Sequence, residues 1–90
     1  IFFMFYAYVI YSPAFSCLYK GHCQDLSKRL KEHNSGKVKS TKAFKPWRFI
    51  YFEEFETLED AVKREKYFKS ATGRRYLRNK EVSSLGSPPG

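Results

Sequence analysis

The stretch that decides the fold is FYAYVI at residues 5–10, followed about ten residues later by YKG at residues 19–21. Each run places a tyrosine in a strand-like segment. Two such runs at this separation predict an antiparallel hairpin. In such a hairpin the phenols of Tyr8 and Tyr19 can lie side by side on one sheet.

The length and the aromatic content suit one small domain. A chain of 90 residues can build a single core but not two. Aromatic residues make up 19% of the sequence, and each ring buries a large area. The same rings can stack on nucleobases, so the aromatic content does not by itself separate a core from a ligand site.

The charge balance is strongly basic. Seventeen lysine and arginine side chains oppose nine acidic ones, for a net charge of +8. Residues 20–48 contain nine basic side chains and two acids, and residues 63–80 contain eight basic side chains and a single acid, Glu65. Such a surface attracts a polyanion by counterion release and predicts salt-sensitive binding. The simpler alternative is a basic protein whose charge serves only solubility.

The cysteines and the apolar start indicate where the protein works. Cys17 and Cys23 are too few for a disulfide framework, and no zinc-type quartet of cysteine and histidine accompanies them. They are predicted to be free thiols in a reducing compartment, which indicates a cytoplasmic location. Residues 1–11 are too short to span a bilayer and carry no basic leader, so they predict a buried strand and no membrane contact.

The first half of the chain predicts two strands and a helix. Residues 3–11 are apolar on both faces, which is typical of a central strand. Residues 12–14 form a turn into a second strand at residues 15–22. A helix follows at residues 25–33, capped by Gln24 or Asp25, with two leucines facing the core.

The second half predicts a strand and one or two helices. A basic loop at residues 37–45 leads to a third strand at residues 47–55. Thr57 opens a helix that is expected to run to about residue 71, where Gly73 stops it. A short helix can follow at residues 74–80, which completes a domain at residues 1–80. The last segment, residues 81–90, is rich in serine, glycine and proline and is expected to be a disordered tail.

The predicted fold class is therefore α/β in the α+β sense. It is a small, mainly antiparallel three-stranded sheet flanked by helices, in the order β-β-α-β-α with a possible final helix.

An ordered set of short motifs resembles a known family. The motifs are YAY at residues 6–8, YKG at 19–21, DLSKRLKEHNSG at 25–36, TK at 41–42, PW at 46–47, EF at 54–55 and AVKREK at 61–66. Together they resemble the GIY-YIG nucleases over residues 4–80. In particular, they resemble small stand-alone members that are similar to the amino-terminal nuclease domain of a bacterial excinuclease. The chain departs from the family pattern at Lys20 and at His22-Cys23.

The resemblance implies roles for four side chains on the hairpin and the first helix. Tyr19 is the implied general base or water-orienting phenol, with Tyr8 beside it, and nearby cations would favour the phenolate. Arg29 would clamp the scissile phosphate through its planar paired donors. His33, one helical turn further on, would position the water or bind a phosphate oxygen. Without the motif, each of these residues has an ordinary structural explanation as a core ring or a helix-surface side chain.

The resemblance also implies a metal ligand and a phosphate track. Glu65 is the implied ligand for one Mg²⁺ or Mn²⁺ ion, since a single carboxylate completed by water and phosphate suits Mg²⁺. The plain alternative is an ion pair between Glu65 and Lys69, four residues further along the helix. The predicted nucleic-acid-binding side chains are Lys20, Lys39, Lys42, Lys45 and Arg48.

The favoured function is a metal-dependent endonuclease that hydrolyses DNA phosphodiester bonds, in DNA repair or recombination. One alternative is a catalytically inactive basic DNA-binding module of the same fold, and another is a structural protein that docks a partner. DNA is the expected partner, and a second protein is one way to supply specificity. The sequence leaves the oligomeric state open.

Overall fold

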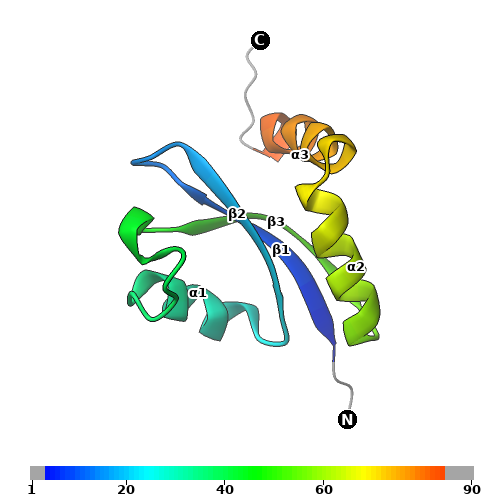
Figure 1. Cartoon of the computed structure of the whole chain (residues 1–90), viewed down its shortest axis with the longest axis horizontal. Coiled ribbons are helices and arrows are strands. Elements are labelled where there is room, and N and C mark those ends of the chain that lie inside the picture. Colours follow the sequence, from blue (N-terminus) through cyan, green and yellow to red (C-terminus); the bar gives the residue numbers. More distant parts are fainter. Residues whose placement is uncertain (1–3, 85–90) are drawn as a thin grey trace.

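The computed structural model describes residues 4–84 and contains the predicted succession of strands and helices (Figure 1). The elements are β1 (Phe5–Ser12), β2 (Cys17–Cys23), α1 (Leu26–Asn34), the short 3-10 helix η1 (Lys42–Phe44), β3 (Arg48–Phe55), α2 (Leu58–Lys69) and α3 (Ala71–Ser84). The predicted α+β fold class and the β-β-α-β-α-α order are confirmed. Within residues 4–84 no helix is long and apolar enough to cross a membrane.

The strand β1 lies in the middle of the sheet, as its two apolar faces predict. The sheet order is β2-β1-β3, and β1 is antiparallel to both neighbours. Residues 7–10 of β1 are all 0% exposed. The pairing with β3 shifts between Val9 and Ile10, while the pairing with β2 is regular and sets Tyr8 opposite Gly21.

The helices cover both faces of this sheet (Figure 1). On one face, Ala7 and Val9 pack against Phe68 of α2 and Leu77 of α3. On the other face, Tyr8 and Ile10 pack with Trp47, and the predicted apolar positions of α1 pack against this second cluster. Because β1 alternates between these clusters, its odd-numbered residues face α2 and α3 and its even-numbered residues face α1.

The hairpin turn is longer than the sequence pattern indicates. The second strand is predicted to begin at residue 15, but β2 begins at Cys17 because the turn extends through Ser16. Ser16 has a left-handed backbone with φ of 52°. Its amide and that of Phe15 both bind the Ser12 carbonyl oxygen, at 2.7 and 3.3 Å. This longer turn leaves Phe15 exposed at the tip of the hairpin.

Both helix caps that the sequence predicts are present. Asp25 accepts a hydrogen bond from the Lys28 amide at 3.0 Å and starts α1. Thr57 accepts one from the Asp60 amide at 3.1 Å and starts α2. These side chains satisfy amides that have no partner inside the helix, so the two start points are encoded locally.

The prediction that α2 runs to residue 71 and stops at Gly73 is wrong. The helix α2 ends at Lys69, and Gly73 lies in the first turn of α3. A side chain at Gly73 would place its Cβ 1.7 Å from the carbonyl oxygen of Tyr67, so the glycine allows α3 to press against the end of α2. Ser70 bridges the corner, since its hydroxyl donates to Tyr67 and accepts from the Gly73 amide.

The last helix is longer than predicted. The helix α3 continues to Ser84, so residues 81–84 of the expected disordered tail have helical backbone. The rest of that tail, residues 85–90, lies outside the described residues, as do residues 1–3.

A cluster of polar side chains fastens α2 and α3 to β3. The Arg64 guanidinium makes two hydrogen bonds to the Glu53 carboxylate, at 2.8 and 3.1 Å. The hydroxyls of Tyr51 and Tyr76 also bond to that carboxylate and to each other. Burial alone would raise the pKa of Glu53, but these bonds, led by the one from Arg64, hold it below its ordinary value. The next residue on α2, Glu65, therefore stands on a well-anchored helix.

Candidate active site

The two tyrosines of the hairpin lie side by side, as predicted, and the structure places both on one face of the sheet. Tyr8 is 0% exposed and lies opposite Gly21 of β2. A Cβ atom at Gly21 would come within 2.6 Å of the Tyr8 hydroxyl and 3.2 Å of the Tyr19 ring. The rings of Tyr8 and Tyr19 both meet the His33 ring edge to face, at centroid distances of 5.8 and 5.2 Å. Glycine at position 21 is therefore what lets the Tyr8 ring lie against β2.

A chain of hydrogen bonds runs from the surface into this face. The Arg29 Nε donates to the Tyr8 hydroxyl at 3.3 Å, and that hydroxyl lies 2.8 Å from Nε2 of His33. On the other side of the ring, Nδ1 of His33 lies 2.8 Å from the Thr41 hydroxyl, which donates to the Val38 carbonyl at 3.4 Å. Because Thr41 gives its proton to Val38, it accepts one from Nδ1, and this assigns Nε2 as the acceptor for Tyr8.

The protonation states agree with this assignment. Burial, together with the charge of Arg29, lowers the pKa of His33 to about 4, so the ring is neutral near pH 7. Burial raises the pKa of Tyr8 to about 12, although the hydrogen bond from Arg29 opposes the shift. Desolvation therefore outweighs the Arg29 cation, and the Tyr8 hydroxyl stays protonated near pH 7.

His33 differs in its surroundings from what the sequence suggests. It is 0% exposed, and both ring nitrogens are engaged by protein groups. In this arrangement it cannot also hold a water or a phosphate oxygen. Its geometry is that of a residue that orients Tyr8, and through Tyr8 the Arg29 side chain.

Tyr19 is the more exposed residue of the tyrosine pair. It is half-buried, with its ring edge against His33 and, at a centroid distance of 6.4 Å, against Trp47. In the part of the chain that the structure describes, its hydroxyl makes no hydrogen bond with protein. The hydroxyl of Tyr19 can therefore reach a water or a substrate atom, which the buried hydroxyl of Tyr8 cannot.

Arg29 links the tyrosines to an open cavity. Its Nη1 atom pairs with Glu32 at 2.9 Å, while its Nε holds Tyr8. Burial acts to lower the pKa of Arg29, but the hydrogen bonds to Tyr8 and Glu32 raise it overall, so the side chain stays cationic. It lines a cavity of about 350 Å³ with Phe5, His22, Cys23, Gln24 and Leu58.

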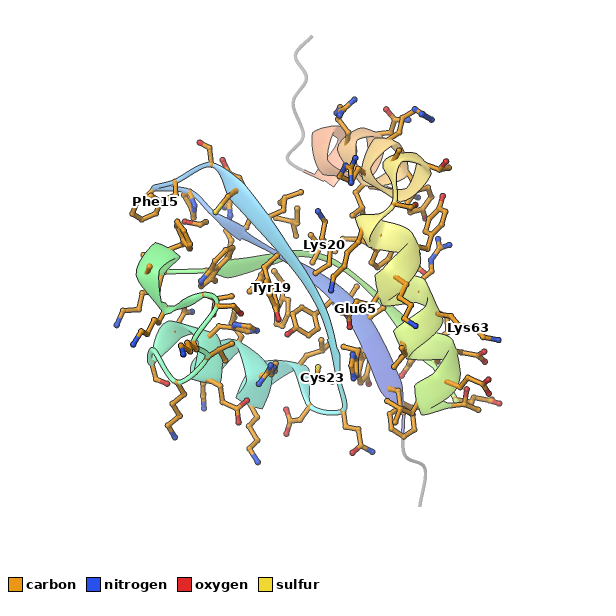
Figure 2. All side chains as sticks on the ribbon, in the orientation of Figure 1. Phe15, Tyr19, Lys20, Cys23, Lys63 and Glu65 are labelled. Carbon is orange, nitrogen blue, oxygen red and sulfur yellow. The ribbon has the colours of Figure 1, made fainter. Side chains whose placement is uncertain are left out.

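Glu65 lies on the opposite side of β2 from Tyr19 (Figure 2). Its Oε1 is 2.5 Å from Nδ1 of His22, and its Oε2 accepts from Lys69 at 2.7 Å. His22 pairs with Ala7 and so faces α2, whereas Tyr19 faces α1. The structure thus brings together Tyr8, Tyr19, Arg29 and His33 and places Glu65 apart from them. His22, which contacts Glu65, lines the same cavity as Arg29.

The carboxylate of Glu65 offers charged oxygen atoms, the type of ligand that a hard cation such as Mg²⁺ prefers. Burial acts to raise its pKa, but the hydrogen bonds from Lys69 and His22 lower it below the ordinary value, so it is ionised at neutral pH. Among residues 4–80, whose side chains the structure describes, no group of three His, Cys, Asp or Glu side chains could hold a metal ion. A Mg²⁺ ion here would therefore take one carboxylate oxygen and fill its other positions with water and phosphate oxygens, which is how Mg²⁺ commonly binds.

The predicted DNA-binding side chains fall into two groups. Lys39, Lys42 and Lys45 are exposed on the loop that contains η1, and Arg48 is exposed with its guanidinium 5.6 Å from the centre of the Tyr11 ring. Lys20 lies on the other side of β2, where it lines a cavity of about 140 Å³ with Leu18, Arg74 and Arg78. The sequence pattern did not single out the two arginines, because only folding brings α3 beside β2.

Two other side chains of the site were not selected from the sequence. Thr41 is 0% exposed and ends the hydrogen-bond chain behind His33, and its position in the TK motif was the signal for it. His22 contacts the Glu65 carboxylate and lines the cavity. The feature of the sequence that could have indicated it is the departure from the family pattern directly after Gly21.

The fold and the site define a small α+β domain in which paired tyrosines and a cationic arginine meet beside a basic surface. A family model for the GIY-YIG catalytic domain matches residues 4–80, and the chain belongs to this family of nuclease domains.

Several proteins are similar to this chain in sequence or in structure. The UPF0213 protein YazA of Bacillus subtilis strain 168 is 41% identical over 69 residues, which cover 72% of this chain and 70% of that protein. A UPF0213 protein of Pediococcus pentosaceus is 42% identical over 69 residues, which cover 76% of this chain and 72% of that protein. The solution structure of the UPF0213 protein BH0048 from Bacillus halodurans superposes with a TM-score of 0.51 over 94% of this chain and 99% of that one, at 24% identity. That likeness supports the fold.

Proposed function

We propose that this protein is a metal-dependent endonuclease that hydrolyses phosphodiester bonds in DNA. The observation that carries the proposal is the difference between the hydrogen-bonded hydroxyl of Tyr8 and the accessible hydroxyl of Tyr19. Tyr8 is locked by His33 and Arg29, whereas the Tyr19 hydroxyl beside it is left for a water or substrate atom. A merely structural pair of rings would need no such buried chain of polar groups behind it.

Each side chain then has a task in hydrolysis. Attack of water on phosphorus requires an oriented water and donors for the charge that develops on the phosphate oxygens. The Tyr19 hydroxyl would orient the water. Arg29 would donate its remaining N–H groups to a phosphate that enters the cavity it lines. Tyr8, His33 and Thr41 would keep the guanidinium in place.

Glu65 is the proposed ligand for one Mg²⁺ or Mn²⁺ ion. When bound, such an ion would stabilise negative charge on the transferring phosphate and the leaving oxygen. The carboxylate would have to exchange its contact with His22 or Lys69 for the ion. The exposure of those two partners supports this exchange, since their side chains are 41% and 54% exposed and can swing into solvent.

The basic side chains are the proposed track for the DNA backbone. Lys39, Lys42, Lys45 and Arg48 would hold phosphates on the η1 side, and Lys20 would do so on the α3 side. Family membership implies DNA as the substrate. A partner protein is the proposed source of further specificity, and a role in DNA repair or recombination is proposed with it. Both cysteines are free thiols, which supports a reducing, cytoplasmic setting.

The second candidate function is an inactive DNA-binding module of the same fold. One observation favours it: both oxygens of Glu65 are already bonded to protein cations or donors, as they would be in a module without a metal. In that case Glu65 serves only to hold α2 against β2.

The experiment that separates the two is cleavage of plasmid, nicked and branched DNA with Mg²⁺ or Mn²⁺. We expect the unmodified protein to cut and Glu65→Ala to lose cleavage while it keeps DNA binding. Glu59→Ala is the matched control, because Glu59 lies on the same helix and also pairs with a lysine four residues on. Binding without cleavage by the unmodified protein would overturn the nuclease proposal, and equal cleavage by Glu65→Ala would remove the metal role of Glu65.

A further inference from the structure

Phe15 and Phe44 form an exposed aromatic pair, here called the aromatic tip, at the end of the hairpin. Phe15 is 53% exposed and Phe44 is 39% exposed, and their rings meet edge to face with centroids 5.3 Å apart. Figure 2 shows Phe15 at the hairpin end, beside the segment that contains η1. Single exposed apolar side chains are common, but two rings that meet on the surface form a patch that suits a ligand.

The tip is held rigidly from two segments of the chain. The Ser12 carbonyl accepts hydrogen bonds from the amides of Phe15 and Ser16, which fixes the turn. The Ser12 hydroxyl, which is 0% exposed, donates to the Phe44 carbonyl at 2.6 Å. One buried serine therefore ties both rings to the end of β1, so the tip is presented to solvent in a defined shape.

The charge around the tip indicates what it binds. Residues 33–52 contain no acidic side chain, and Lys42 and Lys45 flank Phe44 in this stretch. Both lysines are exposed. Aromatic rings that alternate with cations are the arrangement by which proteins bind single-stranded nucleic acid, since bases stack on the rings and phosphates pair with the cations.

We propose that the aromatic tip stacks unpaired nucleobases, so that the preferred DNA contains single-stranded nucleotides close to the scissile phosphate. This inference rests on the proposed function and names its class of substrate. A second copy of this chain is a poor occupant, because each copy has a net charge of +8 and would bring more positive charge to the lysines.

The tip lies close to the candidate site. Phe15 is four residues before Tyr19, which limits their Cα separation to about 14 Å. On the other side, Thr41 directly precedes η1 and holds His33. At roughly 3.4 Å per nucleotide along a stacked strand, the unpaired bases would begin within about four nucleotides of the bond that is cut.

The test compares two DNA ligands and two variants. The ligands are a blunt duplex and the same duplex with a single-stranded overhang. We expect the double variant Phe15→Leu, Phe44→Leu to bind the overhang DNA about tenfold more weakly and the blunt duplex unchanged, because leucine keeps the apolar packing but cannot stack.

Phe52→Leu is the matched control. Phe52 is 49% exposed and meets two other rings, but it lies on the same face of β3 as Glu54, whose exposed carboxylate would repel DNA. We expect this variant to bind both ligands like the unmodified protein.

A measurement on the unmodified protein keeps the test independent of folding. An overhang of abasic nucleotides should bind about tenfold more weakly than the normal overhang, because stacking is lost while the phosphates remain. Equal affinity for the two overhangs would overturn the inference. So would equal losses on both DNA ligands in the double variant, an equal loss in Phe52→Leu, or a change in self-association without a change in overhang binding.

Failure of the inference and failure of the proposed function give different results. If the unmodified protein cuts duplex DNA without any preference for unpaired bases, only the inference is overturned. If it neither binds nor cuts any DNA, the proposed function itself is overturned.

Discussion

The two histidines of this chain lie on opposite faces of one sheet and have opposite surroundings. His33, a residue of α1, is fully buried, with the Tyr8 hydroxyl at one ring nitrogen and the Thr41 hydroxyl at the other. The side chain of His22 is 41% exposed, faces α2 and contacts the carboxylate of Glu65. The first histidine is part of the framework that fixes the tyrosine pair, whereas the second can move away from its partner. His33 belongs to a family motif, and His22 is a departure from the family pattern. In both cases the surroundings of the side chain are known only from the structure.

The largest expected effect is the loss of the buried histidine. His33→Ala would remove the acceptor for the Tyr8 hydroxyl and the donor to the Thr41 hydroxyl and would open a cavity, so we expect a loss of about 3 kcal/mol of stability. Urea denaturation measures this. A loss below about 1 kcal/mol would show that the chain of hydrogen bonds does not hold this face together.

Acidification tests the same histidine without a mutation. The pKa of His33 falls from its ordinary 6.5 to about 4 in the folded protein, so between these values the unfolded chain binds more protons. Stability is therefore full above about pH 6.5 and should decline by about 3 kcal/mol as the pH falls toward 4.

Denaturation curves across this range provide the measurement. His22→Ala should show the same decline. In His33→Gln it should largely disappear, and a decline of unchanged size in that variant would assign the acid sensitivity to other groups.

The tyrosine pair gives an intermediate effect. Tyr8→Phe removes the hydroxyl that His33 and Arg29 share and leaves a buried ring nitrogen without a partner, so we expect a loss of about 1–2 kcal/mol. Tyr19→Phe should leave the melting temperature unchanged but abolish cleavage, because only substrate would use that hydroxyl. Thermal melting and cleavage assays on both variants check this difference between the two hydroxyls, which a stability loss in Tyr19→Phe would contradict.

The smallest effect is expected at the open histidine. His22→Ala removes a surface contact and should change stability by less than about 0.5 kcal/mol, as is usual for exposed positions. On the proposed function it should still change the Mn²⁺ affinity, because Glu65 is then released from one of its two partners. Titration followed by electron paramagnetic resonance of Mn²⁺ measures this, with Lys69→Ala as the matched variant for the other carboxylate oxygen. Unchanged Mn²⁺ affinity in both variants would argue against Glu65 as the ligand.

Much of the fold follows from local patterns in the sequence. The apolar faces of β1, the cap at Asp25 and the cap at Thr57 each depend on residues next to one another in the chain, and each was predicted. The failures occurred where a distant segment decides the local structure. Gly73 has the pattern of a helix stop, but the carbonyl of Tyr67 makes it the contact point between two helices.

The site divides in the same way. The hairpin spacing predicts that Tyr8 and Tyr19 lie side by side, and the i,i+4 spacing places Arg29 and His33 on one side of α1. The burial of His33 also involves the loop that brings Thr41 against its ring, which the spacing does not encode.

The sequence by itself therefore determined the succession of elements, the basic surface and the set of polar groups that the motif selects, because these depend on periodicity, capping and composition. The tertiary structure decided which of those groups are buried and hydrogen-bonded within the protein and which are accessible to a substrate. Burial and hydrogen-bond partners set the pKa of His33 and of Tyr8, and both arise from segments far apart in the chain. The same holds for Glu65, whose contact with His22 exists only because α2 packs beside β2.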